Sequence, residues 1–414
     1  MDRVILHCDC DCFYASVEML YHPEYRHRPM AVGGDPTRRH GIVLAKNQAA
    51  KMQGVKTGEA LWQAQQKCPD IIFLPPCFPL YQQHSAAVRE IFSRYTDQVE
   101  AFGLDECWLD VTGSRRLFGD GETIARRIQK EVREELGITL SVGVSFNKTI
   151  SKLGSDYRKP NGITLLPRSA LAELVWPLPV ERLLMVGPAT TALLKRKGIR
   201  TIGQLANANP SVLKNWMGKR GELLYAYANG WDNSPVARFD ELQLVKSIGN
   251  STTTCRDLTN REEISQVFLL LADSVARRLR KQGLEAKQIC ISLRDTELHT
   301  ITHQMPLSRP TCLSGELHHG ALELFEQVKE EPYAYRSIGI TAQNLCHQGE
   351  PGQLLLGEDP VRRKKQKALE TAVDDLRRRF GSQLVRWGGL LTDLSLTGGN
   401  PSEEHTIHPA AFHP

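Results

Sequence analysis

The segment Arg3–Glu18 constrains this chain more than any other, because it places acidic side chains in a strand that is otherwise apolar. Its first half alternates in polarity, and side chains on a β-strand point to opposite faces with a period of two. One face carries three cysteines, and the other carries Ile5, His7, Asp9, Asp11 and Phe13. Burying two carboxylates is costly unless a positive group neutralises them, and a hard divalent cation is the simplest such group. The segment therefore predicts a metal site.

Two other interpretations of this strand exist. The run from His7 to Cys12 contains the imidazole and thiols that zinc prefers, but structural zinc pairs usually lie two to four residues apart in a turn. Strand alternation holds the three thiols on the face opposite the carboxylates. We interpret the cysteines as small core hydrophobes, while a pair of solvated edge residues remains the alternative for Asp9 and Asp11.

A second acidic pair, Asp105 and Glu106, lies about a hundred residues later. Neighbouring residues on a straight strand face opposite ways, so these two converge only at a turn or bulge, which Gly103 permits. Together with Asp9 they would surround one point with three carboxylates. That arrangement suits two divalent cations roughly 4 Å apart, as in in-line phosphoryl displacement. Oxygen ligands favour magnesium or manganese over zinc.

These segments resemble the signatures of the Y family (DinB/UmuC-like) of translesion DNA polymerases. The first signature corresponds to residues 9–18, the second to 103–110, and the third to 147–162, which ends in Lys-Pro-Asn-Gly. The second signature departs from the family at Gly103, where the family has serine. Three motifs in the family's order are a far stronger signal than one, and the likeness extends from about residue 3 to about residue 380.

The resemblance implies a multidomain α/β (α+β) chain shaped as a right-hand polymerase. The expected parts are a palm (1–15 and 76–165), fingers (16–75), a helical thumb (166–235), a linker (236–245), a little finger (246–349) and a C-terminal basic helix and tail (350–414). In the fingers, composition predicts helices over 44–53 and 58–67. Apolar residues at a spacing of four predict an amphipathic helix over 121–136. The pattern from residue 246 predicts a ferredoxin-like β-α-β-β-α-β order with both helices on one side of a four-stranded sheet.

The resemblance also implies the chemistry of the acidic residues. Asp9 and Asp105 would bridge two Mg²⁺ ions, with Mn²⁺ as a substitute, and Glu106 would hold the ion that lowers the pKa of the primer 3′-hydroxyl. The backbone carbonyl of Cys10 would add an oxygen ligand. Asp11 would lie next to the site without being a defining ligand. The implied reaction is error-prone, template-directed addition of deoxynucleotides past damaged bases.

Five residues are implied in nucleotide binding. Tyr14 would be the steric gate that excludes a 2′-hydroxyl, and Phe13 would pack near the nascent base pair. Lys159 would neutralise the β- and γ-phosphates. Gln48 and Lys51 stand where the family has tyrosine and arginine, and lysine cannot grip a phosphate bidentately as arginine does. The alternatives are a core aromatic for Tyr14 and solvated surface charges for the two lysines.

Further residues are implied in binding primer–template DNA. Residues 185–198 resemble a helix-hairpin-helix, in which Gly187 opens a helix whose backbone N–H groups can bind phosphate. Met185 stands where the family has glycine. In the little finger, the polar positions expected on the free face of the sheet include Lys246, Thr252, Thr254, Arg294 and Arg336. An ordinary solvated sheet face is the alternative.

The region after Gly349 carries two further features. Gln353-Leu354-Leu355-Leu356-Gly357 resembles the family's sliding-clamp peptide but lacks its aromatic anchor, which predicts weakened clamp binding. Residues 361–380 predict a basic helix that touches either DNA or solvent. The Gly, Pro and His content from about Thr397 onward predicts a disordered tail.

Composition bounds these expectations without deciding them. A net charge of +5 is modest, so a nucleic-acid partner must be argued from local patches. Ten cysteines without a disulfide spacing, and no signal peptide or long apolar run, predict a cytoplasmic protein with reduced thiols and no membrane partner. We also expect a monomer. Two other function classes stay open. One is a catalytically silent DNA-binding scaffold, and the other is a two-metal nuclease that cleaves DNA without nucleotides.

Overall fold

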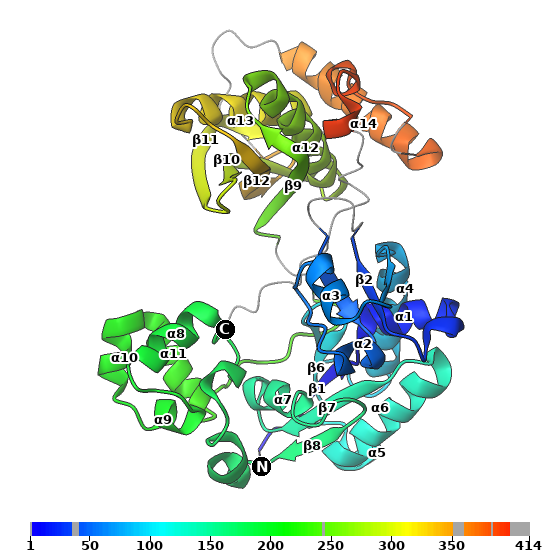
Figure 1. Ribbon diagram of the computed structural model, residues 1–414, viewed down its shortest axis with the longest axis vertical. Coiled ribbons are helices and arrows are strands. Elements are labelled where there is room, and N and C mark those ends of the chain that lie inside the picture. The colour runs from blue at the N-terminus through cyan, green and yellow to red at the C-terminus, as the bar shows by residue number, and fades with distance from the viewer. Residues whose placement is uncertain (1, 35–40, 242–244, 351–359, 382–383, 398–414) are drawn as a thin grey trace. The chain divides into compact units, whose positions relative to one another are not determined.

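The computed structural model describes residues 2–34, 41–241, 245–350, 360–381 and 384–397, which form two compact units (Figure 1). The first unit contains the described residues up to 241, and the second contains those from 245 onward. The division falls within the linker expected at 236–245. Within the described ranges, no helix is both long and apolar enough to cross a membrane.

A five-stranded sheet lies at the centre of the first unit. Its strands, in spatial order, are β5 (Val99–Ala101), β6 (Glu106–Asp110), β1 (Ile5–Cys10), β7 (Leu140–Ser145) and β8 (Ile163–Leu166). The central strand β1 pairs antiparallel with both β6 and β7, and all six of its residues are buried. The acidic strand is therefore an interior strand and not a solvated edge.

Helices cover both faces of this sheet. The face carrying Leu6, Cys8 and Cys10 packs with residues of α4 (Phe78–Ser93) and α6 (Gly121–Leu136) in one apolar cluster. The face carrying Ile5 packs with α7 (Lys148–Ser155). The interpretation of Cys8 and Cys10 as core hydrophobes and the helix predicted over 121–136 are both confirmed. The remaining helices near the sheet are α1 (Phe13–Tyr21) and α5 (Arg115–Phe118).

Residues 16–75 contain a small sheet that the sequence reading did not predict. Its strands are β3 (Val43–Lys46), β2 (Met30–Gly33) and β4 (Ile72–Leu74), accompanied by α2 (Gln48–Met52) and α3 (Leu61–Lys67). The helix predicted over 44–53 is wrong in its first half, because Val43–Lys46 pairs with β2. Asn47 ends the strand and caps α2, since its side chain accepts a hydrogen bond from the Ala50 N–H.

Residues 188–228 are helical with short breaks, as expected for the larger part of 166–235. The helices are α8 (Pro188–Arg196), α9 (Ile202–Ala206), α10 (Pro210–Met217) and α11 (Lys219–Ala228). Short 3₁₀ or π turns occupy Pro23–Tyr25, Arg168–Ala170, Leu171–Val175 and Val180–Arg182. Asp232 anchors the end of this region on α7, because its carboxylate accepts hydrogen bonds from the N–H and hydroxyl of Thr149.

The second unit has the predicted β-α-β-β-α-β order, with both helices on one face of the sheet. The elements are β9 (Ser247–Leu258), α12 (Arg261–Lys281), β10 (Leu284–Asp295), β11 (Thr300–Thr311), α13 (Ser314–Val328) and β12 (Tyr335–His347). The strands lie in the order β11-β10-β12-β9, and every pair is antiparallel. The order of strands and helices predicted from residue 246 is therefore confirmed.

The placement of Thr252 and Thr254 on the free face of this sheet is wrong. Thr252 lies opposite Ile338, which belongs to the core beneath the helices, and opposed residues share a face. Thr254 is buried, and its hydroxyl donates to the carbonyls of Arg256 and Arg336. The sequence reading had the strand correct but its two faces exchanged, as a shift of one residue does.

Three further elements complete the second unit. They are α14 (Pro360–Phe380), η5 (Gly388–Leu391) and α15 (Leu394–Thr397). The predicted basic helix is confirmed as α14, which is tied to α12 by ion pairs of the buried Arg280 with Glu370 and Asp374. The clamp-like peptide 353–357 and the tail beyond Thr397 lie outside the described residues.

Candidate active site

The three predicted carboxylates come together at one end of the central strands. Asp9 on β1 lies directly opposite Glu106 on β6. The carbonyl of Asp105 accepts a hydrogen bond of 2.9 Å from the Cys10 N–H, which closes the turn onto β1. Gly103 has φ 121°, a backbone conformation that favours glycine, so the turn expected before the acidic pair is present.

Burial and the neighbouring negative charges raise the pKa values of Asp9 and Asp105. Burial, followed by the charges of Glu106 and Asp9, raises the pKa of Asp105 to about 7. Burial and Glu106 also raise the pKa of Asp9. Each shift means that the ionised form is disfavoured unless positive charge is nearby. The site therefore favours the binding of cations.

Two lysines supply positive charge from the third motif. Lys159 Nζ lies 2.6 Å from Asp9 Oδ2, and Lys152 Nζ lies 2.9 Å from Glu106 Oε1 and 3.3 Å from Asp9 Oδ2. Asp156 contacts both ammonium groups. Sequence reasoning named Lys159 but missed Lys152. Its spacing of four from Asp156 on a helix that leads to Lys159 was the available signal.

The described side chains around Asp9 leave the carboxylates paired with lysines and not grouped around a metal site. In the part of the chain that the structure describes, no three His, Cys, Asp or Glu side chains form a ready-made metal site. Asp9 and Glu106 are instead directed at lysines. Three carboxylates with mutually unfavourable charges still provide the hard oxygen ligands that Mg²⁺ and Mn²⁺ prefer. The residues fit such ions if the two ammonium groups move aside.

Asp11 has a structural role beside the site. Its buried carboxylate accepts hydrogen bonds of 2.8 Å from the Ser141 hydroxyl and from the Asn161 N–H. These two bonds fix the turn that follows Lys159. Asp11 therefore lies next to the acidic cluster with both oxygens already engaged.

Tyr14 lies on α1, shortly after the end of β1. Its ring stacks on Tyr81, with centroids 4.4 Å apart and planes 13° from parallel, and meets the edge of Phe78. Tyr81 in turn donates its hydroxyl proton to the buried carboxylate of Glu18. Phe13 is only 3% exposed and belongs to the core. The predicted contact of Phe13 with the nascent base pair stays a prediction.

The candidate phosphate-binding lysines come from three separate segments. Gln48 and Lys51 are exposed and one turn apart on α2. Burial raises the pKa of the Cys12 thiol, and the charges of Lys46, Lys51 and Lys159 act against that rise. All three ammonium groups therefore lie within electrostatic reach of one atom at the start of α1. Lys46 was not among the residues singled out from the sequence.

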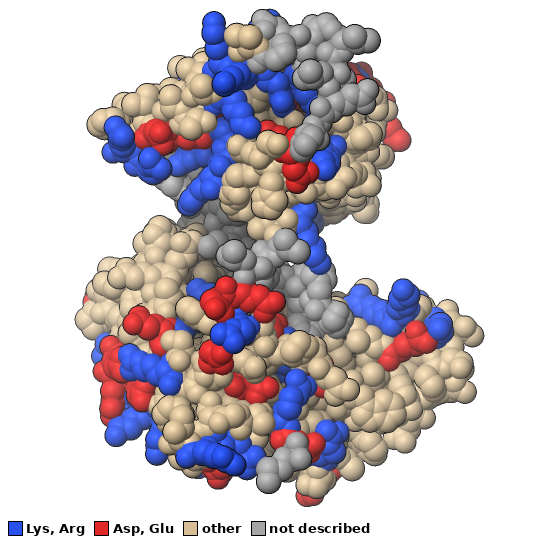
Figure 2. Space-filling model, turned by 180° about the vertical axis from the view of Figure 1, so that it is seen from behind, with Lys and Arg blue, Asp and Glu red and all other residues tan. Residues whose placement is uncertain are grey.

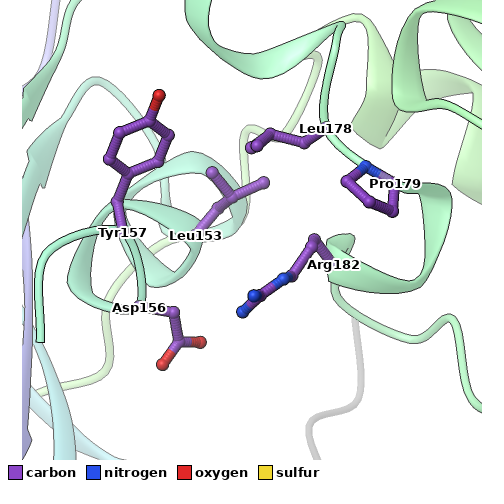
Figure 3. Close-up of a pocket in the computed structure, with 6 residues that line it drawn as sticks. All are labelled: Leu153, Asp156, Tyr157, Leu178, Pro179 and Arg182. Atoms are coloured by element: carbon purple, nitrogen blue, oxygen red, sulfur yellow. The ribbon is translucent and has the colours of Figure 1, made fainter.

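A pocket of about 240 Å³ lies beside this cluster (Figure 3). Its lining residues come from the end of α7 and from the segment that leads into the thumb-like helices: Leu153, Asp156, Tyr157, Leu178, Pro179 and Arg182. Figure 3 shows the carboxylate of Asp156 and the guanidinium of Arg182 directed toward the same opening. Asp156 therefore connects this pocket to Lys159.

The candidate DNA contacts differ in how accessible they are. Gly187 caps α8 beside open space, since a Cβ there would meet no atom within 4 Å. Met185 has φ 71°, so this methionine holds the left-handed turn that glycine adopts without strain. Lys246 and Arg294 are exposed, and Arg336 is half-buried. On the face drawn in Figure 2, basic side chains gather over the second unit.

Comparison with known proteins identifies the family. The impB/mucB/samB family model matches residues 8–156, and the model of that family's C-terminal domain matches residues 245–356. DNA polymerase IV of Acetivibrio thermocellus is 46% identical over 396 residues, which cover 96% of this chain and 99% of that protein. DNA polymerase IV 1 of Bacillus subtilis is 36% identical over 394 residues, covering 94% of this chain and 93% of that protein.

A solved structure of a Y-family DNA polymerase chimera has the same fold. It superposes with a TM-score of 0.74 at 24% identity, and covers 83% of this chain and 100% of the chimera. The order of the sheets and helices thus agrees with a right-hand polymerase. On the sequence matches to DNA polymerase IV proteins, this chain belongs to the Y family of DNA polymerases.

Proposed function

We propose that the chain adds deoxynucleotides to a primer 3′-hydroxyl by two-metal phosphoryl transfer, with Asp9, Asp105 and Glu106 as the acidic residues of the site. The observation that carries this proposal is the convergence of the three carboxylates, with the pKa of Asp105 raised to about 7. Primer–template DNA and nucleotides are the substrates of this family of enzymes. Error-prone synthesis past damaged template bases follows from membership of the family.

Asp9 and Asp105 would hold both ions, and Glu106 and the Cys10 carbonyl would complete the ligand set. The ions, magnesium or manganese, would supply Lewis acidity toward the 3′-hydroxyl and the phosphates. The chain's own contribution is to place the carboxylates at the end of a rigid central strand. Lys152 and Lys159 would neutralise them until the substrates arrive.

The nucleotide would lie between α2 and the turn after α7. Lys159, Lys51 and Gln48 would contact the triphosphate, and Lys46 adds charge on the same side. Tyr14 would exclude ribonucleotides, because its ring is braced by the stack with Tyr81 and cannot swing aside without breaking that contact. Residues 76–165 with 1–15 would be the palm, 16–75 the fingers, 166–235 the thumb and 246–349 the little finger.

The DNA backbone would contact Gly187, Lys246, Arg294 and Arg336. These contacts are sequence-independent, as a polymerase requires. Use of residues 353–357 as a weak clamp peptide, a monomeric state and a cytoplasmic location belong to the same proposal.

Primer extension with Mg²⁺ and all four deoxynucleotides tests the proposal. The parent chain should extend the primer, and the isosteric double variant Asp105→Asn, Glu106→Gln should lose at least about 10³-fold in rate. Asp110→Asn, at the other end of β6, is the matched control and should remain active.

Two results would contradict the polymerase assignment of this site. A folded parent that binds DNA without extending it would indicate the silent scaffold. Cleavage of labelled DNA without nucleotides would indicate the nuclease instead.

A further inference from the structure

The helix α14 is attached to the second unit by charged side chains. Its ion pairs recur at spacings of four and three residues, so they lie on one face of the helix. Along this face lie Arg363, Lys367, Glu370, Asp374 and Arg377, which pair with Glu316 on α13, Glu285 on β10, and Arg280 and Asp273 on α12. The face of α14 that packs on the protein is therefore ionic.

A second face of α14 is apolar and exposed. Leu369, Leu376 and Phe380 follow one another at spacings of seven and four residues, and their exposed fractions are 63%, 42% and 65%. A surface helix of a globular protein normally turns its apolar stripe toward the core. In α14 this arrangement is reversed, and an apolar row left at the surface indicates a site of interaction.

The apolar row has the shape of a helix-packing seam. A repeat of seven residues is typical of the narrow line along which two helices pack. From Leu369 to Phe380 the row extends over roughly three helical turns. A helix that lies in a lipid surface buries a wider apolar face, and DNA would engage cations without covering apolar side chains. The row therefore fits one partner helix best.

Basic residues flank the row near both of its ends. Lys365 precedes Leu369 by four residues and Arg379 follows Leu376 by three, so each lies beside the row. Both cations are exposed, and neither has an ion pair among the described residues. Charges at such flanking positions select the partner in paired helices. Carboxylates beside the seam of the partner would complement these cations.

The same charges disfavour a second copy of α14 as the partner. In a parallel pair, Lys365 would face its own counterpart. In an antiparallel pair with the apolar rows in register, Lys365 would lie near Arg379 of the other copy. Either arrangement brings like charges together, which is destabilising. The partner is therefore a different chain.

We propose that α14 docks an acidic amphipathic helix of another protein. The docking surface consists of Leu369, Leu376, Phe380, Lys365 and Arg379. The apolar seam of the partner helix would cover the three apolar side chains, and its carboxylates would pair with the two cations. This surface belongs to the second unit and shares no residue with the acidic site of the first.

Two designed peptide probes test this surface on the full chain. Each is a helix of three heptads with leucine at the seam positions. The acidic probe carries glutamate at the flanking positions, and the basic probe carries lysine there. Fluorescence anisotropy with labelled peptide, dilute enough to stay monomeric, should show the acidic probe binding at least about 10-fold more tightly. Equal binding of the two probes, or binding of neither, would overturn the proposal.

Substitutions provide the matched comparison. Leu376→Glu should weaken binding of the acidic probe at least about 10-fold. Leu298→Glu, at a comparably exposed leucine between β10 and β11, should leave it unchanged. The double variant Lys365→Glu, Arg379→Glu should bind the basic probe more tightly than the acidic one. Equal affinities in the two leucine variants would contradict the docking surface, and Leu369→Glu repeats the comparison if Leu376→Glu unfolds α14.

Three other results, each obtained without binding of the acidic probe, would assign this face to a different occupant. Attachment to phosphatidylglycerol vesicles that Leu376→Glu abolishes would indicate a lipid surface. Weaker binding of duplex DNA by the double charge variant would indicate DNA. A dimer of the parent chain that Leu376→Glu dissociates in analytical ultracentrifugation would indicate a second copy. Each of these results would overturn the proposal.

Discussion

At the scale of single residues, the acidic site behaves as a set of charges that balance one another. Asp9 and Glu106 are paired with Lys152 and Lys159. Among the described residues, no ion pair involves Asp105, and burial together with the charges of Glu106 and Asp9 raises its pKa to about 7. Substituting any one of these charged groups should therefore change the electrostatic environment of the others. Because of this coupling, the charge balance of the site depends on all of these side chains together.

The raised pKa of Asp105 predicts how stability depends on pH when no metal is present. The folded chain holds a proton on Asp105 up to about pH 7, whereas the unfolded chain releases it near pH 4. The folded state thus binds more protons in this window, and the free energy of unfolding should fall as pH rises from about 4 to 7. Asp105→Asn should remove this part of the decline.

Chemical denaturation in a metal chelator at several pH values measures this effect. The matched control is Asp110→Asn on the same strand, whose pH profile should follow that of the parent. Parallel profiles for the parent and Asp105→Asn would contradict the prediction.

Replacing Lys51 with arginine should strengthen binding of the incoming nucleotide. A guanidinium forms two parallel hydrogen bonds to a phosphate, and the ammonium of lysine acts as a point charge. Lys51→Arg should therefore lower the KM for the incoming nucleotide by about 3- to 10-fold, with little change in kcat. Lys51→Ala should raise it.

Steady-state incorporation of a single nucleotide measures both constants. The control for Lys51→Ala is Lys67→Ala. It also removes one positive charge from this region, since Lys67 lies on α3 and pairs with Glu59. An unchanged KM in Lys51→Arg would show that this position does not reach the triphosphate.

At the scale of elements, the sequence predicted the strand and turn that carry the acidic residues, but it did not predict the strand at Val43 or the face on which Thr252 lies. Strand alternation at Asp9 and the turn at Gly103 are local properties, so the sequence was sufficient. The strand at Val43 depends on pairing with β2, and the orientation of Thr252 depends on its register against β12. Both are decided by distant residues, as is the contact of Lys152 with Glu106.

Gly143 tests the close packing of α7 on the sheet. A Cβ there would lie 2.0 Å from the Ser151 carbonyl oxygen, so the helix that carries Lys152 and Ser155 must shift. Gly143→Ala should lower the free energy of unfolding by about 2–3 kcal/mol or more, and should reduce polymerase activity. Gly113→Ala is the matched control, because no atom lies within 4 Å of a Cβ there. Equal denaturation midpoints for the two variants would contradict this packing.

At the scale of the whole molecule, DNA binding depends on where basic residues lie more than on their excess. The chain has 52 Lys and Arg against 47 Asp and Glu, and many of the described basic residues are engaged in ion pairs. Affinity for DNA should therefore rest on a limited set of exposed cations. Each contact with a phosphate releases counterions, so its loss reduces the salt dependence of binding.

Lys246 is an exposed cation that we expect to contact a DNA phosphate. Lys246→Ala should weaken binding to primer–template of any sequence and should reduce the slope of log K against log salt by about 1. Thr252→Ala is the control from the same strand region, because Thr252 carries no charge and its loss should leave the slope unchanged. Fluorescence anisotropy over a range of salt concentrations measures both. Equal slopes for the two variants would contradict the contact.

The central claim is that Asp9, Asp105 and Glu106 hold two divalent cations for nucleotide addition. Anomalous scattering from Mn²⁺ in crystals of the chain with primer–template and a non-incorporable nucleotide tests it most directly. We predict two manganese ions, both touching Asp9 and Asp105 and one touching Glu106, with Lys152 and Lys159 displaced from the carboxylates. Bound DNA and nucleotide with no manganese, and with both lysines still on the carboxylates, would contradict the claim.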